Sequence, residues 1–376
     1  MKIVSIVGAR PNFMKIAPLV SAFQQTPAVE HLLVHTGQHY DDALSGSFFR
    51  ELGIPKPDIN LEVGSGSQAY QVAETLKRLE PVLLEHQPDV LLVVGDVNAT
   101  VAAALAAAKL GIPVAHVEAG LRSFDDTMPE EINRKVTDVL SRFLFASEAS
   151  GVDNLTREGV AAERVFLVGN VMIDTLLRHR RAAAGSSVLR TLNLQDGAGQ
   201  PLPYAVLTLH RPANVDHPEV LRRLLRAVVE IQPGLPVLFP VHPRTRERLQ
   251  ALAGDPFSGL ILLDPLGYLD FLRLMDCARL VLTDSGGIQE ETTVLGVPCL
   301  TLRENTERPA TLTHGTNQLV GLDPGRIVAA GRAALQGGRQ PGRCPPLWDG
   351  HAAERIVRIL VDQLADQLAV PAPASA

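Results

Sequence analysis

The sequence is poor in cysteine and has no apolar run long enough to cross a membrane. Its 376 residues include three cysteines, which are far apart and not in a C-x-x-C pattern. An odd, scattered set predicts neither a disulfide framework nor a zinc site. The alanine-rich stretch 99–108 is shorter than a membrane span, and the apolar run within residues 1–8 is shorter than a signal peptide requires. We therefore expect a cytoplasmic protein without membrane contact.

Several ligand-binding motifs are also missing. The formal net charge of −6 and the pI near 6.0 come without a large basic block, which argues against a nucleic-acid partner. No G-x-G-x-x-G follows the first predicted strand, and neither a G-x-x-x-x-G-K-[ST] phosphate loop nor an H-E-x-x-H metal motif occurs. The sequence therefore predicts no cofactor and no metal.

The chain length predicts two domains, because single domains usually have 100–200 residues. Short β-branched runs alternate with stretches of helical period, which is typical of α/β units around parallel sheets. We predict domains at 1–169 and 170–351, a surface loop at 182–203, and a last helix at 352–368 that packs back on the first domain. The predicted strands are 2–7, 31–35, 90–94, 114–117, 143–146, 165–168, 205–209, 237–241, 260–262, 280–283, 298–302 and 319–321.

The most informative segment is Asp-Ser-Gly-Gly-Ile-Gln-Glu-Glu at 284–291, between a predicted strand and a predicted helix. A glycine turn at a helix N-terminus presents backbone N–H groups and the positive end of the helix dipole to an anion. Glu290 and Glu291 lie one turn further on, where a carboxylate could accept hydrogen bonds from both hydroxyls of a ribose. The segment therefore predicts a nucleotide diphosphate site.

Charged and polar residues follow five predicted strands. In open α/β sheets ligands bind beyond the carboxyl ends of the strands. Taken singly, each such residue has an ordinary structural interpretation: Asp96 could cap a helix, and Glu118 could be a solvated carboxylate. Their concentration at strand ends favours one functional site. The residues concerned are Arg10, Lys15, Asp96, Glu118, His210 and His242.

Seven segments together resemble the non-hydrolysing UDP-N-acetylglucosamine 2-epimerases, in the same order along the chain. They are 8–15, 36–40, 94–96, 116–122, 129–134, 284–291 and 306–309. The resemblance implies two Rossmann-like doubly wound domains facing a central cleft, as in GT-B glycosyltransferases. It also implies a homodimer that interconverts UDP-N-acetylglucosamine (UDP-GlcNAc) and UDP-N-acetylmannosamine (UDP-ManNAc). The route would be elimination of UDP to 2-acetamidoglucal, followed by re-addition.

The resemblance also assigns roles to individual residues. Asp96, Glu118 and Glu130 correspond to catalytic carboxylates, and His210 is placed to stabilise the departing diphosphate. The residues expected to bind the UDP-sugar substrate are Arg10, Lys15, Arg134, His242, Ser285, Gly286, Gly287, Glu291 and Arg308.

Two segments, 210–216 and 241–246, depart from the pattern of many bacterial relatives, in which they help hold a second, activating UDP-GlcNAc. Such activation is therefore not predicted. The variant segments also resemble epimerases of UDP-2,3-diacetamido-2,3-dideoxyglucuronate, where Arg244 or Arg246 could pair with the sugar carboxylate. A GT-B glycosyltransferase, a hydrolysing relative and a UDP-sugar binder without turnover are further alternatives.

Overall fold

The computed structural model describes residues 1–37, 47–241, 243–250, 259–339 and 344–369. The chain forms two compact units, Met1–Thr175 with Pro346–Ala376 and Leu176–Pro345. The units divide six residues after the domain boundary predicted at 169. No helix among the described residues is long and apolar enough to cross a membrane.

The first unit is built on a parallel sheet of seven strands in the order β3-β2-β1-β4-β5-β6-β7. The outward progression from β1 in both directions is the Rossmann arrangement. The strands are β1 Lys2–Val7, β2 Glu30–His35, β3 Ile59–Asn60, β4 Val90–Val94, β5 Val114–Ala119, β6 Phe143–Ala146 and β7 Val165–Leu167. The helices are α1 Arg10–Gln24, α2 Ser47–Leu52, α3 Gln68–His86, α4 Asn98–Lys109, α5 Pro129–Leu140, α6 Ala149–Arg157, η2 Ala162–Arg164 and α16 Ala352–Ala369. Helix α7, Val171–Ala184, begins in the first unit and continues into the second.

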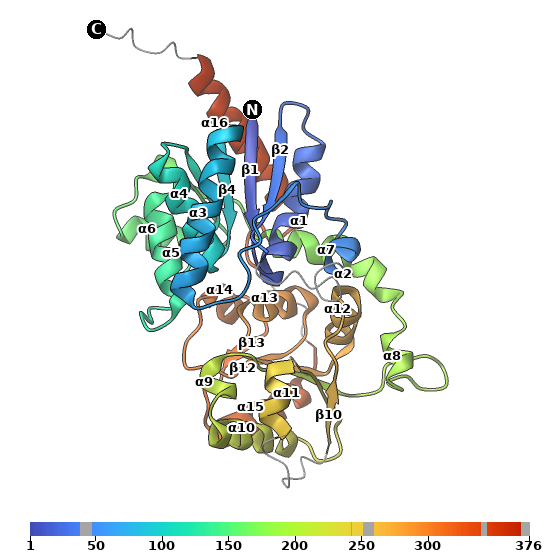
Figure 1. Cartoon of the computed structure of the whole chain (residues 1–376). Helices are drawn as coiled ribbons and strands as arrows, with labels where there is room; N and C mark the ends of the chain where they lie inside the picture. The colour runs from blue at the N-terminus through green and yellow to red at the C-terminus, as the bar shows by residue number, and fades with distance from the viewer. Residues whose placement is uncertain (38–46, 242, 251–258, 340–343, 370–376) are drawn as a thin grey trace, which may run out of the picture. The chain divides into compact units, whose positions relative to one another are not determined.

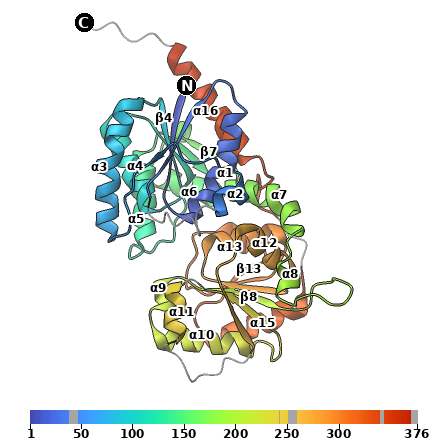
Figure 2. The same ribbon diagram turned by 45° about the vertical axis from the view of Figure 1, so that its right-hand side comes forward.

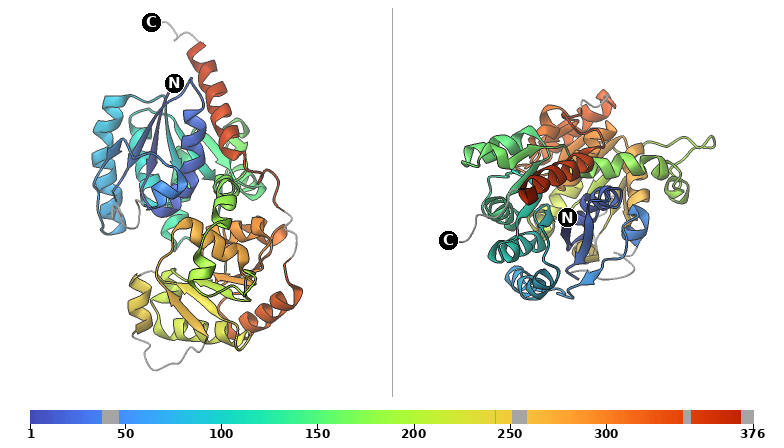
Figure 3. Two further views of the ribbon diagram at one scale, coloured as in Figure 1. Left: turned by 90° about the vertical axis from the view of Figure 1, so that its right-hand side faces the viewer. Right: turned by 90° about the horizontal axis from the view of Figure 1, so that it is seen from above.

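Helices cover both faces of this sheet. Figures 1 and 2 show α3, α4 and α5 on one face and α1 on the other. Helix α4 lies between α3 and α5, and its alanine side chains allow close packing on buried valines and leucines of β1 and β4. Helix α4 ends before Gly111, whose φ of +71° breaks the helix as the Gly-Ile-Pro segment predicts. Helix α16 packs against α1, so the last helix belongs to the first unit (Figure 3).

The second unit repeats the same order with six parallel strands, β10-β9-β8-β11-β12-β13. Its core lies between the sheet and helices α10 and α15. The strands are β8 Ala205–Thr208, β9 Val237–Pro240, β10 Leu260–Leu263, β11 Leu280–Thr283, β12 Cys299–Thr301 and β13 Asn317–Leu319. The helices are α8 Val188–Thr191, α9 Pro212–Val215, α10 Pro218–Glu230, α11 Pro243–Gln250, α12 Tyr268–Cys277, α13 Gly286–Leu295, α14 Pro309–Thr313 and α15 Pro324–Gly337.

The predicted fold class, two Rossmann-like α/β domains, is confirmed, and each predicted strand overlaps an observed one. Two local predictions need correction. Strand β3 was not predicted, because a strand of two residues is too short to show a periodicity. The prediction of a surface loop at 182–203 was wrong in part. Helix α7 extends to Ala184, and α8 forms because Val188 and Leu189 are buried next to α12.

Candidate active site

In the first unit, the turn after β1 is tied to the end of β4. The Asn12 side chain accepts hydrogen bonds from the backbone N–H groups of Gly8 and Ala9, at 3.1 and 3.2 Å. Its amide nitrogen donates to the Val94 carbonyl at 3.0 Å. One side chain therefore fixes both strand ends at the edge where parallel sheets bind ligands.

Lys15 and Glu118 form a buried ion pair at this edge. The ammonium group lies 2.8 Å from the Oε1 atom of Glu118, and the two side chains are 6% and 3% exposed. A Cβ atom at Gly95 would lie 2.6 Å from Lys15 Nζ, so glycine is needed there for the lysine to pass. Glu118 itself has a φ of +76°, and the β5–β6 register shifts between Val117 and Ala119. Such bulges redirect a side chain and occur often beside active sites.

Asp96 is held by Arg134 of α5. The guanidinium Nε and Nη2 atoms lie 3.0 and 2.8 Å from Asp96 Oδ2, and Nη1 lies 2.6 Å from Glu131 Oε2. Glu131 also accepts the backbone N–H of Ser123. The N-cap position of helix α4 is Val97, not Asp96, so Asp96 lies one residue before the cap.

Glu130 lies in the first turn of α5 and is partly exposed. It precedes Arg134 by four residues, which places both on one face of the helix. The structure thus brings Lys15, Asp96, Glu118 and Arg134 to neighbouring strand ends, with Glu130 one helical turn from Arg134. Arg10 is the first residue of α1, and its side chain lies outside the described part.

In the second unit, the key contact is between His210 and Asp284. The ring Nδ1 atom of His210 lies 2.8 Å from Asp284 Oδ1, and Asp284 also accepts the backbone N–H of Arg211 and the amide of Asn214. Burial alone would raise the pKa of Asp284, but His210 and these donors outweigh it and hold the pKa below its usual value. The ionised carboxylate orients the half-exposed imidazole, so that Nε2 is the ring nitrogen directed away from Asp284.

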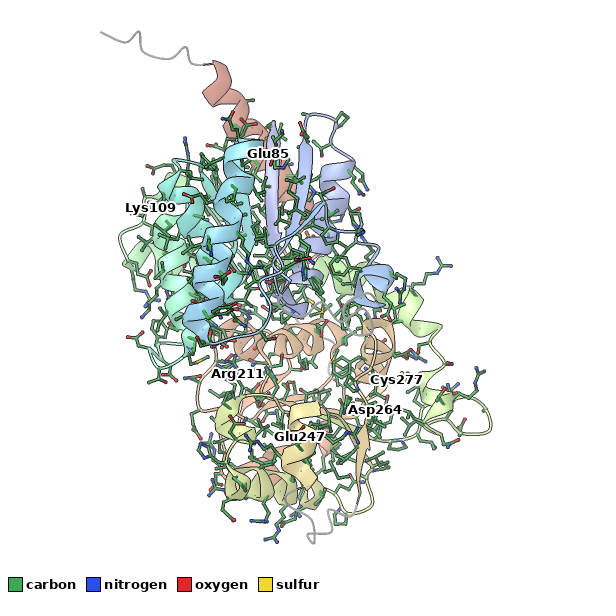
Figure 4. All side chains as sticks on the ribbon, viewed as in Figure 1. Glu85, Lys109, Arg211, Glu247, Asp264 and Cys277 are labelled. Carbon is green, nitrogen blue, oxygen red and sulfur yellow. The ribbon has the colours of Figure 1, made fainter. Side chains whose placement is uncertain are left out.

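The glycine segment opens α13, as the sequence predicts. Ser285 is the residue before the helix, and Gly286 begins it. The first N–H groups of a helix have no partner within it, so they can bind an anion. A Cβ atom at Gly286 would lie 2.5 Å from Glu307 Oε1, which explains the glycine. Arg303 lies 2.7 Å from that carboxylate, and Arg211 lies 4.0 Å from it (Figure 4 labels Arg211).

Two carboxylates of α13 have contrasting partners. Glu290 forms a buried ion pair with Arg308 at 2.8 Å. Glu291 accepts a hydrogen bond from the Tyr268 hydroxyl at 3.2 Å. Burial raises the pKa of Glu291 to about 7, although the Tyr268 hydrogen bond acts in the opposite direction. Glu291 is therefore a buried carboxyl with a neutral donor, which suits it to accept further hydroxyl groups.

The second unit thus brings His210 and Asp284 together after β8 and β11, while Ser285 and Gly286 begin α13 and Gly287 follows in its first turn. His242 lies outside the described residues. Sequence reasoning assigned no role to His116, Glu131, Asp138, Tyr268 or Asp284. One available signal was the spacing of Glu130, Arg134 and Asp138, which places three charged residues on one helical face.

Family models, curated relatives and solved structures were compared with this chain. A family model described as UDP-N-acetylglucosamine 2-epimerase matches residues 21–361. The UDP-N-acetylglucosamine 2-epimerase of Methanocaldococcus jannaschii is 42% identical over 370 residues, which cover 96% of this chain and 99% of the relative. The UDP-2,3-diacetamido-2,3-dideoxy-D-glucuronate 2-epimerase of Pseudomonas aeruginosa is also 42% identical, over 89% of this chain and 92% of the relative.

A solved structure agrees with these sequence matches. The M. jannaschii epimerase, crystallised in complex with UDP-GlcNAc and UDP, superposes with a TM-score of 0.88 at 41% identity. The alignment covers 96% of this chain and all of the other. The resemblance inferred from seven short segments is thereby confirmed over nearly the whole sequence, and this chain belongs to the UDP-N-acetylglucosamine 2-epimerase family.

Proposed function

We propose that this protein is a non-hydrolysing isomerase that interconverts UDP-GlcNAc and UDP-ManNAc. The main support is the pair of carboxylates, Asp96 and Glu118, at the neighbouring ends of β4 and β5, each held by a cation. The high identity to the M. jannaschii relative over full length points to the same substrate.

The chemistry explains why such a site is needed. The hydrogen at C2 of the sugar is weakly acidic, because no adjacent carbonyl delocalises the resulting charge. A base therefore removes this proton while the C1–O bond breaks, and UDP leaves with the bonding electrons to give 2-acetamidoglucal. Re-addition forms the C1–O bond again and places a proton on the opposite face of C2. Asp96, Glu118 and Glu130 are the proposed acid and base groups, each of which contributes on the order of 10²–10⁴ in rate.

The second unit is proposed to bind the UDP portion. The N–H groups at Gly286 and Gly287 are proposed to bind the diphosphate, and the His210 imidazole to stabilise the charge that develops as UDP leaves. The N–H of Ser285 donates to Thr283 Oγ1 at 3.0 Å, so it would have to exchange this partner to join them. Removing one such donor typically lowers the rate by about 10²–10³. Arg10, Lys15, Arg134, His242 and Arg308 are proposed to contact the substrate, with Glu291 accepting the ribose hydroxyls.

The decisive test is solvent isotope exchange. UDP-GlcNAc incubated with the enzyme in D₂O should yield both UDP sugars with deuterium at C2, detected by NMR. Retention of the original hydrogen would contradict elimination. Free N-acetylmannosamine and UDP would indicate a hydrolase, and a turnover that appears only with an acceptor would indicate a glycosyltransferase.

A second candidate substrate is UDP-2,3-diacetamido-2,3-dideoxyglucuronate. The P. aeruginosa relative that is named for this sugar is as similar to this chain as the M. jannaschii relative. Arg246 lies 2.8 Å from Asp264, an exposed residue labelled in Figure 4 that the sugar carboxylate would have to displace. The side chain of Arg244 is not described. Assaying both substrates side by side by NMR distinguishes the two specificities through kcat/KM.

We also propose that the protein is a homodimer, on the strength of the family resemblance, and that it is cytoplasmic, because three scattered cysteines fit a reducing compartment. Light scattering should then give twice the chain mass of 40.4 kDa. A mass equal to one chain across the micromolar range would contradict the dimer without affecting the proposed reaction.

A further inference from the structure

A buried histidine lies beneath the candidate carboxylates of the first unit and has no part in the proposed chemistry. His116, on β5, is fully buried. Its Nε2 atom lies 2.8 Å from the Gly95 carbonyl oxygen, and its Nδ1 atom lies 2.7 Å from Asp138 Oδ1. A carbonyl oxygen can only accept, so Nε2 donates to Gly95. The imidazole therefore links α5 to the residue immediately before Asp96.

Asp138 extends this link to the other carboxylate. Its Oδ2 atom accepts the backbone N–H of Gly120 at 3.1 Å and lies 2.7 Å from Arg122 Nη2. Burial alone would raise the pKa of Asp138, but His116 and Arg122 outweigh burial and lower it. The aspartate is thus an ionised acceptor that holds the backbone two residues after Glu118.

The segments held in this way have unusual backbone conformations. Gly95, Glu118 and Gly120 have φ angles of +67°, +76° and +80°. The left-handed region costs a non-glycine residue roughly 1–2 kcal/mol, so Glu118 keeps this conformation only because its surroundings enforce it. A Cβ atom at Gly120 would collide with the Gly151 carbonyl, which leaves little freedom on that side.

We propose that His116 and Asp138 are positioning residues for the epimerase reaction. They hold the backbone beside Asp96 and Glu118 in the geometry that proton transfer at C2 requires. This inference rests on the proposed function. The hydrogen bonds of the pair end on the two backbone segments that carry these carboxylates. They add to the β4–β5 ladder, in which the Gly95 N–H donates to the Val117 carbonyl, and so restrain the turns beyond the last ladder bond. A displacement near 1 Å at a reacting group can lower the rate by about 10²-fold.

The test compares His116→Gln and Asp138→Asn with the wild type. We expect kcat to fall about 10–100-fold, while KM and the dissociation constant of UDP change less than threefold. With substrate deuterated at C2, the primary isotope effect should rise, since proton transfer becomes more rate-limiting. An isotope effect is a property of each active molecule, so a smaller folded fraction does not change it. His116→Ala should lose more activity than His116→Gln, which keeps a donor for Gly95.

Asp174→Asn is the matched control. Asp174 is another buried aspartate of the first unit, and it accepts the backbone N–H groups of Ala352 and Ala353, away from the carboxylates of β4 and β5. This variant should lose stability but keep the kcat per folded molecule and the isotope effect. Equal behaviour of Asp138→Asn and Asp174→Asn, or variants of His116 and Asp138 with wild-type kcat and isotope effect, would overturn the inference. A wild type that exchanges no hydrogen at C2 would instead refute the proposed function itself.

Discussion

The two units share one strand order, yet the turn after the corresponding strand contains different chemical groups in each unit. Strand β4 lies beside β1 in the first sheet as β11 lies beside β8 in the second. The turn after β4 places the Asp96 carboxylate before α4, whereas the turn after β11 places Ser285 and Gly286 before α13. The Asp96 carboxylate suits the first turn to proton transfer. The second turn also contains a carboxylate, Asp284, but it is buried and paired with His210, so the N–H groups that begin α13 remain for an anion. The proposed roles of the two units therefore differ because of the residues at their strand ends, not because of their fold.

Removing the carboxylates of the first unit should have the largest effect. We expect Asp96→Asn and Glu118→Gln to lower turnover by about 10² or more, with UDP affinity unchanged, because they remove acid–base groups. Turnover by NMR and UDP binding by calorimetry provide the measurements. Glu118→Gln should also reduce stability more than Asp96→Asn, since it leaves buried Lys15 without its carboxylate. A parallel loss of UDP affinity in both variants would contradict the division of roles.

A matched pair of glycine substitutions, one in each unit, tests whether the two turns have different roles. In Gly95→Ala the new methyl group meets Lys15 and the residue keeps a φ of +67°, so kcat should fall at least tenfold while UDP binding persists. In Gly286→Ala the methyl group meets Glu307 beside the proposed diphosphate site, so UDP affinity should fall about tenfold, or about 1.4 kcal/mol. Calorimetry and steady-state kinetics on both variants measure this. Identical profiles for the two would remove the distinction between the units.

The last prediction concerns stability in the second unit rather than turnover or UDP binding. The pKa of Glu291 is raised to about 7 in the folded protein, because burial favours the neutral form. The stability that this group contributes is therefore fully present below its ordinary pKa of 4.5 and is lost as the pH rises through 7. The wild type should therefore lose up to about 3 kcal/mol of stability from this group between pH 4 and pH 8. Glu291→Gln should unfold at a higher temperature than the wild type at pH 8 and at a similar temperature at pH 4.5.

The same variant should bind UDP more weakly, because the amide offers one acceptor oxygen to the two ribose hydroxyls. Thermal unfolding at the two pH values and UDP titration at pH 8 test both parts. A Glu291→Gln variant that is less stable than the wild type at pH 8 would show that the charged carboxylate is compensated in the folded protein.

Local patterns in the sequence predicted most of the architecture. Parallel strands buried on both faces read as short β-branched runs, so every strand longer than β3 was found, and the glycine segment at 284–291 predicted the start of α13. The same reasoning placed Lys15, Asp96 and Glu118 after strands, because the carboxyl ends of parallel strands share one edge. Helix α8 was missed because burial of Val188 and Leu189, not local propensity, stabilises it.

Periodicity and residue type were enough to predict the strands, the glycine turn and the chemical groups at the strand ends. The partners of these groups became visible only in the folded chain: Arg134 for Asp96, Asp284 for His210, and Asp138 for His116. Tertiary structure also decided the left-handed backbone of Glu118. Partners tens of residues apart meet only when the sheet is assembled, and a strained backbone persists only where surrounding contacts enforce it.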